Sequence, residues 1–371
     1  MVERRLVLTG DFLRPFPMPS GWESATWKNI RWLDGIVGTA ARLAGFEVST
    51  VSWDERLGVD AGYFDTPAVY RALGLPLSTD GWARLAGLAE IDAELADALL
   101  APFRDSLVVG YEMPDLLLAL LDEAGIAVVD LVLHPLRFLD DLVFALRTNR
   151  PEIHALLLAN ELDAELPALS AGRIRSKAAW MAPPLPLSPG TVLILGQVAR
   201  DRAALDAETG RFAHLGEHGA ELLDLVTGAS MALFKPHPYD HAASPSQVAM
   251  RAFGSVQRTE ANLYHLLAQD EVETVVALNS SGLDEAAVFG KRTVWLRPPL
   301  YAFGRTSPGP AGGFGEAVPQ DGAWTEPAFW RLLAAGTAQP APPISGMPRP
   351  NRLRKSMNAD WGFGAIDRIL A

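Results

Sequence analysis

Short apolar runs alternate with longer amphipathic segments along the first half of the chain. The runs "RRLVLTGDF", "EVSTVSW", "DSLVVGYE" and "IAVVDLVL" have the composition of buried strands. Between the first two, residues 24–45 carry apolar positions at helical spacing, with Ser24 as a possible cap and Gly45 as a stop. A long helix is predicted over much of 79–101. This alternation predicts a parallel sheet with helices on both faces.

A second alternating series follows a proline-rich stretch at residues 177–190. Its predicted strands are "TVLILG", "MALFKPHP", "ETVVALN" and "RTVWL", and we expect a loop at 304–323 and a final helix in "ADWGFGAIDRIL". The fold class is therefore α/β, with two Rossmann-like domains whose parallel sheets face each other across a cleft. We place the domains at 1–185 and 186–348, and we expect 349–371 to pack across their junction.

Composition narrows the functional classes. The 371 residues are 49% apolar and 20% charged, as in a folded protein, and the formal net charge of −12 opposes general nucleic-acid binding. There is no cysteine, so thiolate chemistry is excluded. No apolar run approaches the roughly 20 residues of a membrane-spanning helix, and the amino terminus is unlike a signal peptide, so we expect a cytoplasmic protein.

Ligands of open α/β sheets bind beyond the carboxyl ends of the strands, and one such end has the sequence "ALFKPHPYD". Pro236 and Pro238 restrict the backbone on either side of His237. Lys235 and His237 together provide a cation and a hydrogen-bond donor, which suits a phosphate. The alternative at this point is a stiff structural corner with a satisfied histidine.

The stretch "LNSSGLDEAAVFG" supplies a second strand end with the same chemistry. Asn279, Ser280 and Ser281 stand between a predicted strand and a predicted helix, and Ser281 with Asp284 has the form of a capping box. Two hydroxyls and the unpaired N–H groups of a helix start can bind an anion. Serines that only cap a helix remain the alternative, but two phosphate-suited strand ends in one domain are less common than one.

Further candidates follow other strands. Tyr301 could stack on a base, Gln197 marks the exit of the strand "TVLILG", and Asp201 could act as a nucleophile or base with a neighbouring arginine keeping it ionised. In the first domain, Asp11, Glu112 and Arg137 follow predicted strands, and Arg137 could bind a carboxylate. Each of these residues has an ordinary reading as a cap, a surface charge or a packed side chain.

Several familiar motifs are missing from the sequence. No G-x-G-x-x-G, G-x-x-x-x-G-K-[ST] or G-x-S-x-G occurs, so dinucleotide, P-loop and hydrolase sites are unsupported. No D-x-D occurs either, which argues against a metal-chelated nucleotide diphosphate. Because Pro238 separates His237 from His241, a helical zinc pair is also unsupported. We expect no metal and no cofactor.

The pair "FKPHP" and "NSSGLDEAAVFGKRTVWL" resembles the HP and SS motifs of bacterial capsule and lipopolysaccharide glycosyltransferases that use CMP-activated sugars. It is most similar to the retaining β-Kdo transferases, and bacterial sialyltransferases share the two motifs. "LILGQVARD" and "YAFGRTSPG" resemble further segments of the capsule family, and the resemblance covers about residues 190–310.

The resemblance implies a GT-B architecture with an acceptor-binding first domain and a nucleotide-sugar-binding second domain. It implies that Lys235, His237, Pro238, Ser280, Ser281 and Tyr301 bind the CMP portion. It further implies Asp201 as nucleophile and Glu112 as acid/base, and Arg137, Asp11 and Gln197 as ligands of the sugar carboxylate or the acceptor. The partners implied are a CMP-sugar donor and an oligosaccharide or glycolipid acceptor, with peripheral inner-membrane or assembly-complex association as an additional expectation.

Other readings remain open at this point. An inverting, sialyltransferase-like enzyme would use a first-domain carboxylate as base and no nucleophile. A non-catalytic glycan-binding subunit would bind CMP without turnover, and a GT-B enzyme of the epimerase type would prefer UDP to CMP.

Overall fold

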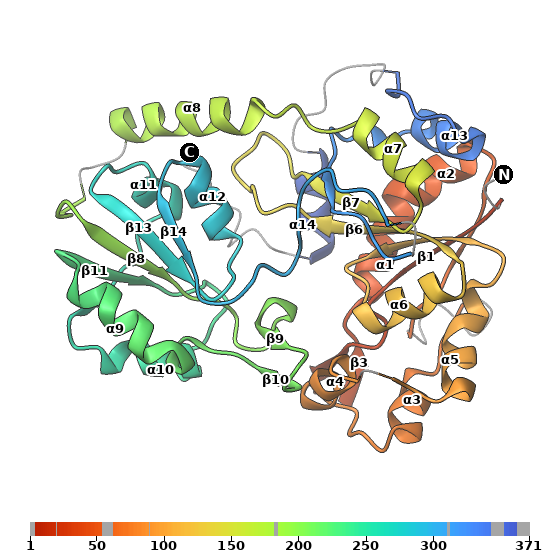
Figure 1. Cartoon of the computed structure of the whole chain (residues 1–371), viewed down its shortest axis with the longest axis horizontal. Helices are drawn as coiled ribbons and strands as arrows, with labels where there is room; N and C mark the ends of the chain where they lie inside the picture. Colours follow the sequence, from red (N-terminus) through yellow and green to blue (C-terminus); the bar gives the residue numbers. More distant parts are fainter. Residues whose placement is uncertain are drawn as a thin grey trace.

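The computed structural model describes residues 4–19, 21–53, 62–88, 90–181, 185–309, 312–342 and 352–361. Two α/β units lie side by side, each with a central sheet covered by helices on both faces (Figure 1). The α/β class with two Rossmann-like parallel sheets, expected from the alternating pattern, is confirmed. No helix in the described part of the chain is long and apolar enough to cross a membrane.

The first sheet has the strand order β15-β7-β6-β5-β1-β4. Its parallel strands are β1 (Arg5–Gly10), β4 (Glu47–Thr50), β5 (Leu107–Tyr111) and β6 (Ala127–Leu133), and its antiparallel edge is formed by β7 (Phe144–Thr148) and β15 (Val318–Pro319). Every residue of β5 is buried, as expected for a central strand covered on both faces. The antiparallel edge is absent from the prediction.

Helices cover the two faces of the first sheet. One face carries α1 (Trp27–Leu33), a π-helical turn (Asp34–Gly38), α2 (Thr39–Leu43), α7 (Pro151–Ala159), α13 (Pro327–Ala335) and α14 (Arg352–Trp361). The other face carries α3 (Thr66–Ala72), α4 (Thr79–Ala86), α5 (Ala93–Leu100) and α6 (Asp115–Glu123). The predicted long helix over 79–101 is two helices, because α4 ends at Gly87 and Asp92 caps a new helix by accepting from the Leu95 N–H at 2.8 Å.

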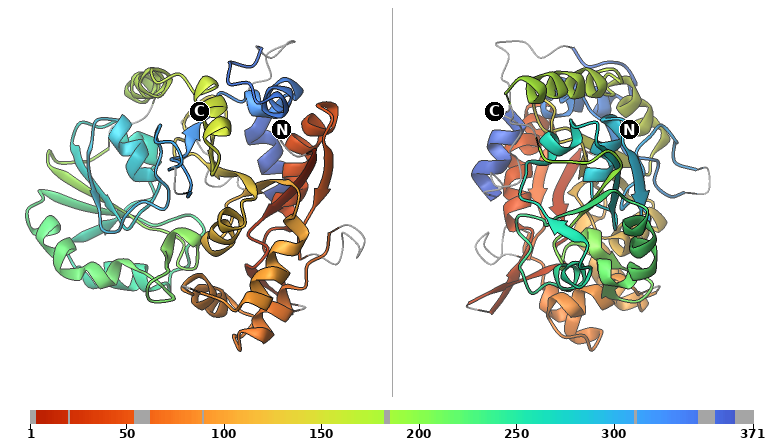
Figure 2. Two further views of the ribbon diagram at one scale, coloured as in Figure 1. Left: turned by 45° about the vertical axis from the view of Figure 1, so that its right-hand side comes forward. Right: turned by 90° about the vertical axis from the view of Figure 1, so that its left-hand side faces the viewer.

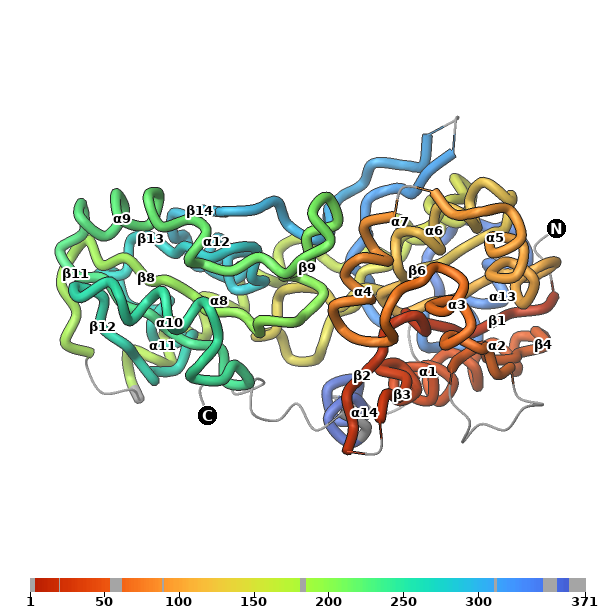
Figure 3. The backbone as a smooth tube through the Cα atoms, turned by 90° about the horizontal axis from the view of Figure 1, so that it is seen from below, coloured from red at the N-terminus to blue at the C-terminus, as the bar shows by residue number. Residues whose placement is uncertain are grey.

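A small hairpin precedes α1. It consists of β2 (Pro15–Met18) and β3 (Gly21–Ser24), which pair with each other in an antiparallel arrangement. The helix therefore begins at Trp27 rather than at the predicted Ser24, which belongs to β3 and accepts a hydrogen bond from the Thr26 N–H. The hairpin leads into α1 and projects from the side of the first domain, and β2 contacts α4 (Figure 3).

The second sheet is entirely parallel, with the strand order β12-β11-β8-β13-β14. The strands are β8 (Thr191–Leu195), β11 (Met231–Lys235), β12 (Val256–Arg258), β13 (Val272–Ala277) and β14 (Arg292–Trp295). One face is covered by α9 (Gly219–Thr227) and α10 (Pro245–Ala252), and the other by α8 (Leu166–Met181), α11 (Leu263–Leu267) and α12 (Gly282–Val288). Because β8 is central, its exit lies between the exits of β11 and β13.

After β14 the chain returns to the first sheet. β15 pairs with β7, and Trp324, Phe329 and Trp330 are fully buried in the core of the first domain. The predicted second domain, 186–348, includes this segment. In the structure, the apolar face of α13 is instead buried against α2 and α7 of the first domain (Figure 1). The helix α14 packs on α1, and most of the predicted helix in "ADWGFGAIDRIL" lies outside the described residues.

The two domains touch through a second hairpin, formed by β9 (Leu205–Asp206) and β10 (Arg211–Phe212). It extends from the second domain onto α4 of the first, where the rings of Phe212 and Trp82 are 6.1 Å apart (Figure 2). This contact places the residues that follow β8 against those that follow β1 and β5.

Candidate functional site

The Lys-Pro-His-Pro corner after β11 packs directly on the exit of β8. The Gly196 N–H donates to the Lys235 carbonyl at 2.9 Å. A Cβ atom at Gly196 would lie 3.1 Å from the Pro236 Cα and 3.2 Å from the His237 nitrogen, so a side chain would press on the backbone of the corner. The glycine therefore lets the two strand exits approach closely and fixes the position of His237.

The ring of His237 is held by the turn that follows it. Its Nδ1 accepts from the Tyr239 N–H at 3.1 Å, which leaves Nε2 as the donor of the neutral ring. Burial lowers the pKa of His237, against the opposing effects of Asp201 and Asp240. Burial also lowers the pKa of Lys235. A neutral ring that presents one N–H is suited to bind a phosphate oxygen.

Gln197 joins the exit of β8 to the exit of β13. Its Nε2 donates to Oδ1 of Asn279 at 2.9 Å, and its Oε1 accepts from the Asn279 N–H at 3.0 Å. Asn279 is followed by Ser280, whose hydroxyl accepts from the Gly282 N–H at 3.3 Å. The exits of β11, β8 and β13 thus form one continuous rim, which we call the strand-exit rim (Lys235–Pro238, Gly196–Gln197 and Asn279–Ser281).

Ser281 is the exposed N-cap residue of α12, which has seven residues. Within the described part of the chain its side chain makes no cap hydrogen bond, so the predicted capping box with Asp284 does not form. Because the helix is short, we assign any anion binding here to the hydroxyls and nearby N–H groups rather than to a helix dipole.

Asp201 follows β8 and lies at the junction between the domains. It caps a short 3₁₀ turn, η5 (Arg202–Ala204), by accepting from the Arg202 N–H at 2.8 Å. Its carboxylate also contacts the guanidinium of Arg14, a first-domain residue, at 3.4 Å. The Asp201 side chain is 51% exposed, so it remains open to a ligand.

Arg202 crosses the junction to the first domain. Its buried guanidinium donates to the Glu112 carbonyl and pairs with Asp115 at 3.4 Å. Glu112 has a φ of 49°, an uncommon conformation for a residue other than glycine, and its N–H donates to the Leu131 carbonyl at 2.9 Å. Partners from β6 and from the second domain therefore hold this backbone on both sides.

Glu112 lies within the electrostatic influence of Asp201. Burial raises the pKa of Glu112, and the charge of Asp201 raises it further, while Arg202, Arg14 and Arg137 oppose the rise. The Asp201 carboxylate, in contrast, is half-exposed to solvent. Arg14, which pairs with Asp201, lines the same hollow as Glu112, so the predicted acid/base and the predicted nucleophile share a cationic neighbour while differing in exposure to solvent.

Asp11 lies on the first-domain side of the same junction. Its Oδ2 accepts from the Trp82 Nε1–H at 3.0 Å, and burial raises its pKa while Arg202 and Arg14 oppose the rise. Asp11 and Glu112 both line a hollow of about 30 Å³ to which Arg202 contributes from the second domain.

Arg137 contacts the helix α12 of the second domain through its backbone. Its backbone N–H donates to Oε1 of Glu285 at 2.7 Å, and its charge opposes the rise in pKa of Glu112. Burial raises the pKa of Glu285 to about 7. Among the described residues, the buried Nε of Arg137 has no hydrogen-bond partner, so a donor remains for a ligand.

Tyr301 packs beside the antiparallel edge of the first sheet. Its ring packs beside the first sheet, with the guanidinium carbons of Arg147 and Arg202 at 5.2 and 5.8 Å from its centroid. The structure therefore brings Tyr301 together with one arginine from each domain, and its predicted contact with the nucleotide stays a prediction.

Two charged residues of the site are absent from the sequence prediction. Asp130 in β6 and Arg147 in β7 face each other in the register of the sheet, and the Arg147 Nε donates to Asp130 Oδ2 at 2.9 Å. The Asp130 carboxylate also accepts from the Met113 N–H at 3.0 Å. A charged residue inside the apolar run "IAVVDLVL" is the signal that could have identified this pair.

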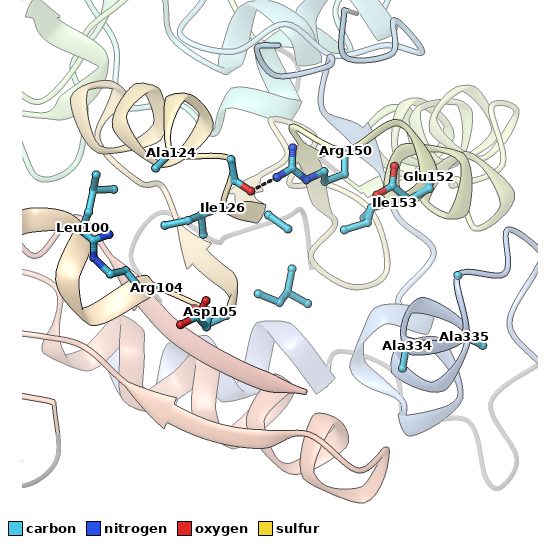
Figure 4. A pocket seen from close by; sticks show the side chains of 15 residues that line it. Leu100, Arg104, Asp105, Ala124, Ile126, Arg150, Glu152, Ile153, Ala334 and Ala335 are labelled. Carbon is cyan, nitrogen blue, oxygen red and sulfur yellow. Dashed lines mark hydrogen bonds between the residues drawn. The ribbon is translucent and has the colours of Figure 1, made fainter. Parts of the chain in front are cut away.

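A larger hollow of about 660 Å³ lies at the opposite end of the first sheet, where its parallel strands begin (Figure 4). It is bordered by the starts of β5 and β6 and by Arg104, Arg150 and Glu152, and Arg150 donates to the Gly125 carbonyl. Because ligands of such sheets bind at the carboxyl ends of the strands, we place the functional site at the domain junction despite the larger volume here. Among the residues that the structure describes, no three His, Asp or Glu side chains are grouped as metal ligands.

No family model matches the sequence, and no curated protein matches it significantly. Among solved structures, the chain is similar to the β-Kdo 2,7 transferase of KpsC from Thermosulfurimonas dismutans, with 14% identity and a TM-score of 0.35 over 57% of this chain and 72% of that chain. It is also similar to the β-Kdo 2,4 transferase of the same KpsC, with 18% identity and a TM-score of 0.32 over 50% of this chain and 67% of that chain. At these identities and TM-scores the likeness carries no argument about residue roles, which rest on the geometry described above.

Proposed function

We propose that the chain is a glycosyltransferase that moves Kdo, or a related 2-keto sugar acid, from its CMP-activated form to a surface polysaccharide acceptor. One observation carries this proposal. The HP-like and SS-like stretches are joined into a single strand-exit rim by Gly196 and Gln197. Asp201, which follows the same strand as Gln197, pairs with Arg14, and Arg14 lines the same hollow as Glu112.

The rim would bind the CMP portion of the donor. The Nε2–H of His237, the ammonium of Lys235 and the hydroxyls of Ser280 and Ser281 are suited to the phosphate oxygens. These groups would stabilise the negative charge that develops on CMP as it leaves. We expect no metal for this step, because the leaving group is a monophosphate and the rim supplies donors of its own.

The junction would carry out the transfer. The Asp201 carboxylate attacks the anomeric carbon, the bond to CMP breaks, and a covalent sugar intermediate forms. The acceptor hydroxyl then gives its proton to Glu112 and attacks the same carbon, which releases Asp201 as a carboxylate. Two displacements give net retention. Arg137, with its free Nε, is assigned to the carboxylate of the sugar.

The experiment is a donor assay with CMP-Kdo, which measures CMP release, product anomer by NMR and adducts by mass spectrometry of the intact protein. We expect a retained product and an adduct on Asp201 that accumulates without acceptor and is lost in Asp201→Ala. An inverted product would identify a sialyltransferase-like mechanism. CMP binding without turnover would identify a binding subunit, and tight UDP binding without CMP binding would refute the assignment of the rim.

A further inference from the structure

One carboxylate at the domain junction has an oxygen without a hydrogen-bond partner among the described residues. Asp11 is 5% exposed, and its Oδ2 is bonded to Trp82, but Oδ1 is buried and has no hydrogen-bond partner among the described residues. Leaving a buried acceptor unsatisfied costs about 1–3 kcal/mol, and more for a charged group, so such an atom calls for an explanation. A ligand that binds there would remove the penalty.

The hollow beside Asp11 has the size and polarity for such a ligand. Its volume of about 30 Å³ accommodates one hydroxyl group or one water molecule. Glu112 lines the same hollow, and Thr26 and Asn29 add polar side chains from the start of α1. The hollow is therefore a place where a hydroxyl can lie close to both carboxyl groups.

A hydroxyl carries a single proton, so one hydroxyl cannot donate to two carboxylates at once. If the attacking hydroxyl gives its proton to Glu112, Asp11 needs a second donor from the same substrate. A carboxylate cannot bind the carboxylate of the donor sugar without like-charge repulsion. Of the two roles expected for Asp11 from the sequence, the geometry thus favours the acceptor.

We propose that Asp11 is an acceptor-binding residue that accepts a hydrogen bond from the hydroxyl adjacent to the attacking one. The acceptor class is accordingly a polyol or sugar with neighbouring hydroxyls, rather than an alcohol with a single hydroxyl. This inference rests on the proposed function, and it concerns only the second displacement. Proton balance is unchanged: the attacking hydroxyl gives its proton to Glu112, and the neighbouring hydroxyl keeps its own.

The test compares the two half-reactions in the wild type and in Asp11→Asn, which has nearly the same shape. The first half-reaction is read as the rate of adduct formation on Asp201 from CMP-Kdo. The second is read as the breakdown of the adduct with glycerol, which has neighbouring hydroxyls, or with 1-propanol at the same concentration. Asp97→Asn is the matched control, because Asp97 is an exposed partner of Arg104 on α5.

In the wild type, glycerol should accelerate adduct breakdown about tenfold more than 1-propanol, as one lost hydrogen bond to a charged group predicts. In Asp11→Asn this preference should disappear, while adduct formation stays within about twofold of the wild-type rate; Asp97→Asn should behave as the wild type. Three results would overturn this inference and leave the proposed function standing. The wild type could use the two alcohols equally, glycerol could fail to accelerate adduct breakdown, or Asp11→Asn could slow both half-reactions equally. A wild type that forms no adduct and releases no CMP would instead overturn the proposed function.

Discussion

The side-chain amide of Gln197 forms two hydrogen bonds with Asn279, one from its Nε2 to Oδ1 at 2.9 Å and one from the Asn279 N–H to its Oε1 at 3.0 Å. These bonds connect the exits of two neighbouring parallel strands. They hold the serines of the second corner at a fixed distance from the histidine of the first. The resemblance implied that Gln197 binds the sugar carboxylate or the acceptor, and that role stays a prediction; what the structure shows is one hydrogen bond from each end of its amide to Asn279.

Replacing Gln197 by glutamate should weaken CMP binding about fivefold to tenfold. The carboxylate can still accept from the Asn279 N–H, but it cannot donate to Oδ1 and faces that oxygen with a negative charge; a lost hydrogen bond typically costs about 1 kcal/mol. Isothermal titration calorimetry with CMP measures the effect. Gln257→Glu, on the exposed edge strand β12, is the control and should bind as the wild type does.

His237→Ala should lose CMP affinity by about ten- to a hundredfold, because a hydrogen bond to a charged group contributes about 1.5–3 kcal/mol. The melting temperature should change little, since the ring is only half-buried. His241→Ala removes an exposed histidine four residues later and serves as the control. If both variants bind CMP equally well, the corner has only a structural role.

Gly196→Ala tests the close approach of the two strand exits. The new methyl group would meet the Pro236 Cα at 3.1 Å and must displace the corner, so we expect a loss of about 1–3 kcal/mol in unfolding free energy and weaker CMP binding. Urea unfolding and calorimetry measure the two effects. Gly254→Ala is the control, because no described atom lies within 4 Å of the Cβ it would add.

Glu285→Gln should flatten the dependence of stability on pH. Burial raises the pKa of Glu285 from 4.5 to about 7, so the folded protein favours the protonated form. Its stabilising contribution is complete below about pH 4.5 and is lost as the pH rises through about 7, with a decline of about 1.4 kcal/mol per pH unit between these two values. Urea unfolding between pH 4.5 and 8 should show a steeper decline for the wild type than for Glu285→Gln. Parallel declines would contradict the assignment.

Arg202→Met should move the pH profile of the transfer step. Arg202 opposes the rise in pKa of Glu112, so its removal raises that pKa further. Glu112 acts as the base only when ionised, and the acidic limb of kcat should therefore shift to higher pH. A purely structural role would lower kcat without moving the limb. Arg200→Met, in which an exposed side chain is removed, should leave the profile unchanged.

The alternation of apolar runs predicted both parallel sheets because their central strands, such as β5 and β8, are buried on both faces. It did not predict β7 or β15, since an antiparallel edge made from "FALRT" and a two-residue strand leaves no periodic signal. The return of α13 to the first domain was also missed. The position of α13 depends on the burial of Trp324 and Trp330 against residues far away in the sequence, which local patterns do not encode.

The candidate site, like the fold, could be predicted from the sequence only in part. Residues that directly follow strands, such as His237, Ser280 and Asp201, could be identified because the ends of parallel strands share one edge. The partners that hold them could not: the contact of Arg202 with Glu112 spans two domains. The bond between Trp82 and Asp11 joins α4 to the loop after β1, and no local pattern indicates it.

The most direct test of the account is a crystal structure of the protein with CMP. We predict that the phosphate lies on the strand-exit rim, within hydrogen-bond distance of His237 Nε2 and of the Ser280 or Ser281 hydroxyl, with the leaving oxygen directed toward Asp201. CMP bound elsewhere, for example in the hollow beside Arg104 and Arg150, would contradict the proposal that the rim binds the phosphate. A phosphate that contacts neither His237 nor Ser280 would contradict it as well.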